Sequence, residues 1–172
     1  MVSIPSYNTH IATYDPIATI TLTSAQSSVT FSNITQEYSD LHVVVNAIAN
    51  PANDLIITIN NDSGSNYSRT VLYGTGTSAS STRGSNLNIM YCDAYMSLDT
   101  SEYSIYTIDF FQYSNTNLYK TSLVSATRAG RGMDKQVNLW RSTSAITSLK
   151  FFADTGNLTG GKISLYGIRG EL

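Results

Sequence analysis

Apolar and polar positions alternate along this chain in short runs, and clusters of Gly, Asn, Asp and Ser separate the runs. Strict alternation predicts a strand over residues 19–23, and β-branched density predicts one over 40–49 with both faces covered near its middle. The same reasoning predicts strands at 29–31, 55–59, 69–73, 86–92, 103–111, 120–126, 136–140, 146–152 and 162–166. No segment has the periodicity of an amphipathic helix, so the pattern predicts an all-β protein.

The number and spacing of these strands favour an antiparallel β-sandwich of jelly-roll type. No unit of fixed length repeats, which disfavours a propeller or a solenoid. Residues 1–16 contain two prolines and no clean periodicity, so we expect an extended N-terminal arm there, followed by a single β-sandwich domain at 17–172. The Gly/Ser/Thr-rich stretch at 74–85 is expected to be a long loop.

The composition narrows the classes of partner. Charged residues make up 13% of the chain, about half the usual share, and Ser, Thr and Asn take their place. A surface with few charges is easier to desolvate when it packs against another protein. The 10 Lys and Arg residues are scattered and the net charge is −2, which argues against nucleic-acid binding. No apolar run is long enough to span a membrane.

The residues that could carry catalysis or bind a metal lack the patterns that such sites require. Cys92 is the single cysteine, and neither His10 nor His42 stands in a recognisable nucleophile motif. Residues 60–66 resemble a calcium loop, but the glycine is misplaced and the closing Glu is missing, so a hairpin turn is expected. We therefore expect no enzymatic activity, no metal ion and no cofactor.

One predicted loop, at residues 127–134, contains Arg128, Arg131 and Met133. Arg is favoured at protein interfaces because its planar head makes several hydrogen bonds at once. These three residues are therefore a candidate contact with another subunit or a partner. The alternative is an ordinary solvated loop.

Several turn and strand motifs form a recognisable series. They are Asn-Asp-Ser-Gly-Ser-Asn-Tyr-Ser within 59–68, Leu-Tyr-Gly-Thr-Gly at 72–76, Ser-Thr-Arg-Gly-Ser at 81–85, Leu-Trp-Arg-Ser-Thr-Ser-Ala-Ile-Thr at 139–147, and Ile-Ser-Leu-Tyr-Gly-Ile at 163–168. The series resembles a group of small virion proteins and fibre domains of tailed bacteriophages. The resemblance covers residues 17–168. It implies a jelly-roll-like domain on the virion surface, often trimeric, with no catalytic residues to transfer.

A stand-alone domain with a short arm looks more like a capsid decoration (cement) protein than a fibre. We therefore expect a homotrimer that binds the major capsid protein and stabilises the assembled head. The arm would order on docking, through Ile4, Pro5, Tyr7, Ile11, Tyr14 and Pro16.

The alternative is a tail-fibre or receptor-binding module that recognises host surface glycans through Tyr and Asn in loops 60–68 and 74–85. Residues 1–7 lack the basic and apolar regions of a signal peptide. We therefore expect synthesis in the host cytoplasm and a final location on the virion surface.

Overall fold

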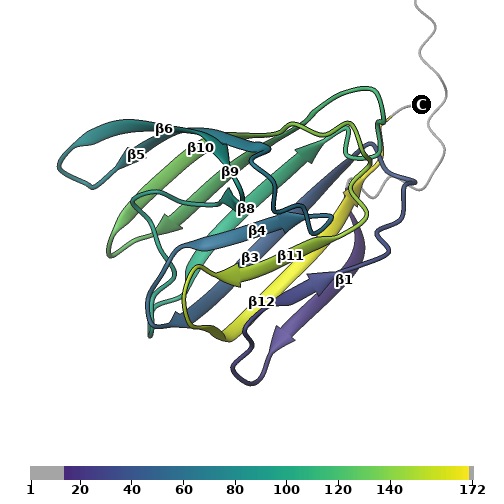
Figure 1. The fold of residues 1–172 in the computed structure, drawn as a ribbon. Helices are drawn as coiled ribbons and strands as arrows, with labels where there is room; N and C mark the ends of the chain where they lie inside the picture. The colour runs from purple at the N-terminus through teal and green to yellow at the C-terminus, as the bar shows by residue number, and fades with distance from the viewer. Residues whose placement is uncertain (1–13, 171–172) are drawn as a thin grey trace, which may run out of the picture.

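The computed structural model describes residues 14–170, which form two antiparallel β-sheets packed face to face (Figure 1). The predicted all-β antiparallel sandwich is confirmed. The strands are β1 (Asp15–Leu22), β2 (Val29–Phe31), β3 (Asp40–Asn50), β4 (Leu55–Ile59), β5 (Tyr67–Gly74), β6 (Ala79–Leu87), β7 (Met90–Tyr91), β8 (Ser104–Phe111), β9 (Lys120–Arg128), β10 (Gly132–Trp140), β11 (Leu149–Ala153) and β12 (Asn157–Ile168).

The two sheets differ in size. The large sheet has eight strands in the order β1-β12-β3-β8-β9-β10-β5-β6, and the small sheet has four in the order β2-β11-β4-β7. The chain crosses between them repeatedly, and the β5–β6 and β9–β10 hairpins add four strands to one side of the large sheet. In Figure 1 the small sheet, with β4 and β11, lies in front of the large one.

Alternate residues of the central strands fill the space between the sheets. Leu41, Val43 and Val45 of β3 are fully buried, because successive side chains of a strand point to opposite faces. His42 and Val44 point the other way and remain partly exposed. The prediction that both faces of this strand are covered is therefore wrong, since the small sheet covers only one face of the large sheet.

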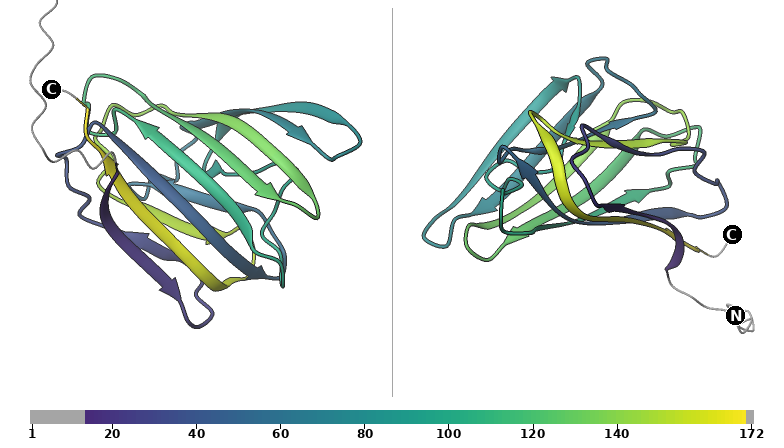
Figure 2. Two further views of the ribbon diagram at one scale, coloured as in Figure 1. Left: turned by 180° about the vertical axis from the view of Figure 1, so that it is seen from behind. Right: turned by 90° about the horizontal axis from the view of Figure 1, so that it is seen from below.

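The predicted loop at 74–85 also differs from the structure. Only a short turn remains there, closed by the Thr75 amide donating to the Ser78 carbonyl at 2.9 Å, and β6 follows. Nearly all β6 side chains are exposed, and the hairpin extends beyond the sandwich (Figure 2). Backbone pairing with β5 makes this strand without any apolar alternation, which is why the sequence pattern misses it. The predicted strand at 86–92 is split between the end of β6 and β7.

Candidate functional site

The outer face of the large sheet, which turns away from the small sheet, is the candidate functional site. No layer of the described residues covers it. Ten large hydrophobic side chains among the described residues are exposed, and the strand alternation places six of them on this face. They are Leu72, Ile105, Phe111, Leu123, Met133 and Val137.

These six side chains gather on β8, β9, β10 and β5, and we call this part of the outer face the apolar half. Leu123 lies directly opposite Val137 on the neighbouring strand, and such cross-strand pairs share one surface. Ser and Thr residues fill the positions between them, and Lys135 is the one cation that the described part of β10 presents here. Scattered single apolar residues are normal on a protein surface, but a contiguous group marks an interaction site.

The remaining part of the outer face, on β1, β12 and β3, is more polar and carries aromatic rings. Tyr14 packs edge-on against His42, with ring centroids 5.1 Å apart, and against Tyr166 at 6.4 Å. The Nδ1 atom of His42 lies 2.5 Å from Oδ1 of Asp109, which is its register partner on β8. This ring cluster lines a hollow of about 290 Å³ together with Val44.

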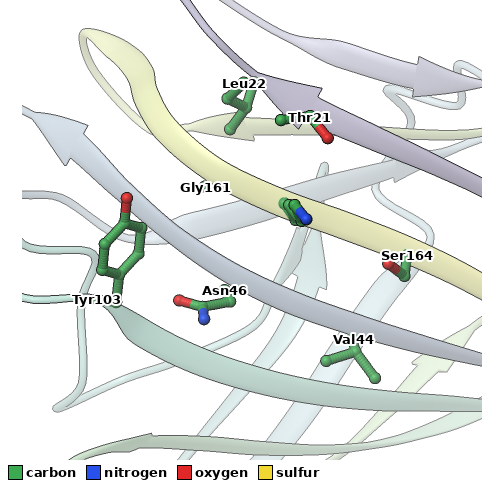
Figure 3. Close-up of a pocket in the computed structure, with 8 residues that line it drawn as sticks. Thr21, Leu22, Val44, Asn46, Tyr103, Gly161 and Ser164 are labelled. Carbon is green, nitrogen blue, oxygen red and sulfur yellow. The ribbon is translucent and has the colours of Figure 1, made fainter.

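A second and larger depression, of about 570 Å³, adjoins this cluster and shares Val44 with it (Figure 3). In Figure 3, Tyr103 stands at one end of the depression, and Val44 and Ser164 lie at the other. Its lining comes from β1, β3, β12 and the residue that precedes β8, namely Thr21, Leu22, Val44, Asn46, Tyr103, Gly161, Lys162 and Ser164.

The structure separates the three residues of the predicted partner loop. Arg128 is buried and holds the 97–102 segment, with its guanidinium 3.1 Å from the Asp99 carboxylate and 3.4 Å from that of Glu102. Arg131 is exposed, but its Nε donates to the Tyr95 carbonyl at 2.7 Å and its head stacks on the Tyr95 ring. Met133 is 53% exposed and belongs to the apolar half. The segment itself is a tight hairpin between β9 and β10.

Two of the six predicted arm residues, Tyr14 and Pro16, fall within the described part of the chain. Pro16 lies in β1, in register with Tyr166 of β12, and Tyr14 packs on the large sheet as described above. The sheet therefore begins two residues before the predicted domain boundary, at Asp15. Ile4, Pro5, Tyr7 and Ile11 lie outside the described residues.

The buried carboxylates hold loops in place. One oxygen of Asp134, on β10, accepts hydrogen bonds from the backbone amides of Ala94, Tyr95 and Met96. One oxygen of Asp93 accepts from the Leu55 amide and the Tyr106 hydroxyl. Burial, and then the nearby Asp54 carboxylate, raises the pKa of Asp93 well above its usual value.

The side chains of Asp62 and Cys92 also have structural roles in the fold. Asp62, in the segment that resembles a calcium loop, accepts from Trp140 Nε1, the Gly64 amide and Asn66 Nδ2, as expected of a turn residue. Burial raises the pKa of the Cys92 thiol well above its usual value.

Within residues 14–170, no group of three His, Cys, Asp or Glu side chains is arranged to hold a metal ion. The same residues include no helix with the length and hydropathy needed to cross a membrane.

No protein-family model matches this sequence, and no curated protein matches it. The function proposed below is therefore inferred from the outer face. The sequence predictions do not include this face, although the sequence carries a signal for it: residues 105–108 are nearly continuously apolar, and only one of the two alternating sets of side chains enters the core.

Proposed function

We propose that this chain is a non-enzymatic protein of a bacteriophage virion surface that docks on the major capsid protein through the apolar half of its outer face. The observation that carries the proposal is the group of exposed aliphatic side chains on β8, β9, β10 and β5. Burying such a group on a partner removes apolar area from water, which is the main driving force of protein association.

The strand order supports the phage part of the proposal. Without the β5–β6 and β9–β10 hairpins, the sheets read β1-β12-β3-β8 and β2-β11-β4-β7. Along the chain these eight strands alternate between the sheets, except that β4 and β7 follow one another in the small sheet. We infer that this is a jelly roll, an architecture used in viral capsids. It agrees with the turn and strand motifs that resemble phage virion proteins.

Few charges need to be desolvated on this surface. The outward carboxylate of β8, Asp109, is already engaged by His42. Two exposed cations would require new partners, namely Lys135 and Arg83, which lies on β6 in register with Thr70. Contacts made by residues 1–13 would add a second attachment, and two linked contacts hold more tightly than either alone. A homotrimer centred on a local three-fold axis would repeat both contacts at each coat subunit.

The test uses the phage that encodes the protein. Tagged protein is incubated with purified heads, and the bound fraction is measured after sedimentation. The double variant Leu123→Asp/Val137→Asp should bind at least about tenfold more weakly, because two charges would be buried without partners. Leu118→Asp is the matched control, since Leu118 is 52% exposed in the loop between β8 and β9.

Equal binding of the double variant and the control would show that the apolar half is not the surface that docks on the capsid. Immunogold electron microscopy of the virion tests the location independently. Label over the head supports the proposal, whereas label confined to the tail or to fibre tips would overturn the capsid assignment.

A further inference from the structure

We propose that the groove formed by the two adjoining hollows on β1, β12 and β3 binds a short acidic oligosaccharide. We call it the outer groove, and it is lined by Tyr14, His42, Tyr166, Val44, Ser164, Thr21, Lys162, Asn46 and Tyr103, with Leu22 and Gly161 beneath. This inference concerns the half of the outer face that the capsid-docking proposal does not use, so neither depends on the other.

The register brings the polar groups of the groove together. Lys162 lies opposite Thr21 on one neighbouring strand and opposite Asn46 on the other. Ser164 lies opposite Val44, two residues further along β12. From Lys162 to Tyr166 the strand advances about 13 Å, which is the length of a di- or trisaccharide.

Tyr103 provides an aromatic surface at one end. Its side chain is 49% exposed, and its ring stands beside the depression with the hydroxyl toward β12 (Figure 3). A Cβ placed on Gly160 would lie 3.7 Å from that hydroxyl, so the tyrosine leans over a strand segment that lacks side chains. The Tyr14 and Tyr166 rings border the other end. Sugar rings present apolar C–H faces that stack on such aromatic surfaces.

Three polar side chains of the groove are free to bind a ligand. Within residues 14–170, the side chains of Asn46, Lys162 and Tyr103 have no hydrogen-bond or ion-pair partner, and Asn46 and Lys162 are exposed. An amide, a hydroxyl and an ammonium group together match the hydroxyl rim of a sugar and one carboxylate. Asp109 and Glu102, the carboxylates bordering the groove, face His42 and Arg128, which leaves Lys162 available for an acidic group on the ligand.

Other ligand classes fit less well. A peptide that adds a strand needs a free sheet edge. Within the groove, β12 pairs with β1 and β3, and β3 pairs with β12 and β8, and the free edge of β1 lies on the side away from β12. A nucleic acid needs several cations along its backbone, and Lys162 is the one Lys or Arg that lines the described groove. A purely apolar ligand would leave the amide and the ammonium group buried without partners.

The test is a glycan array that displays neutral oligosaccharides together with oligosaccharides that contain uronic or sialic acids. The protein is presented multivalently, and affinities of the hits are then measured by titration calorimetry. We expect binding to acidic glycans, a loss of at least about tenfold for Tyr103→Ala, and a loss for Lys162→Gln on acidic glycans only. Tyr119→Ala is the matched control, because Tyr119 is 55% exposed but lines neither hollow.

Thermal melting of each variant verifies that the sandwich is intact, and Lys162→Gln remains informative if Tyr103→Ala does not fold. An array without signal above background would overturn the proposal, as would hits whose affinity Tyr103→Ala leaves unchanged. Equal binding of neutral and acidic glycans would overturn the acidic preference. Because no capsid is present in this assay, its failure says nothing about docking on the head.

Discussion

Replacement of Asp134 by Ala should remove the carboxylate that holds the 94–96 turn against β10. One oxygen of this fully buried side chain accepts the backbone amides of Ala94, Tyr95 and Met96 at 2.6, 2.9 and 3.0 Å. In Asp134→Ala these three donors lose their acceptor. A buried donor without a partner costs the desolvation of that group, because no water replaces the lost bond.

The expected magnitude follows from the hydrogen bonds. A hydrogen bond to a charged acceptor contributes about 1.5–3 kcal/mol, and three bonds to one oxygen do not add fully. We expect Asp134→Ala to lower the free energy of unfolding by about 3–5 kcal/mol. At a urea dependence of about 2 kcal/mol per molar, the unfolding midpoint would fall by about 1.5–2.5 M.

The assay is urea unfolding followed by the fluorescence of Trp140, together with amide hydrogen exchange of residues 94–96. Asp134→Asn is the control, since its carbonyl oxygen can accept the same three amides, and it should lose about 1 kcal/mol. A loss below about 1 kcal/mol for the Ala variant, or equal losses for Ala and Asn, would refute the reasoning. Unchanged exchange at residues 94–96 would refute it as well.

Two further predictions concern stability. Burial and the Asp54 carboxylate raise the pKa of Asp93, so its stabilising contribution is complete below about pH 4 and is lost as the pH rises through the raised pKa. Asp93→Asn should therefore lose less stability than the wild type between pH 4 and 8 in urea titrations, and parallel curves would contradict this. A Cβ on Gly161 (φ +117°) would lie 2.0 Å from the Asn46 carbonyl oxygen, whereas Gly76 (φ +86°) has open space. Gly161→Ala should cost at least about 3 kcal/mol and Gly76→Ala about 1–2 kcal/mol in thermal melts, and equal costs would contradict the steric argument.

The sequence by itself determined the local elements. The predicted strands at 29–31 and 55–59 match β2 and β4 at both ends, because alternation with period two and turn-forming residues are properties of neighbours along the chain. The all-β class followed from the same patterns. The turn at 60–66 was also predicted, since Asn and Asp side chains bond to nearby backbone groups.

Only the tertiary structure decided which side chains remain exposed. Val44 and Leu123 are apolar residues of predicted strands, which favours a place in the core, but they lie on the face that the small sheet does not cover. Arg128 reads as a surface residue, but Asp99, distant in the chain, makes its burial favourable. The outer groove pairs Lys162 with Asn46 across strands more than a hundred residues apart. Such contacts depend on sheet order and register, which a local pattern does not specify, because the same alternation is compatible with many pairings of strands.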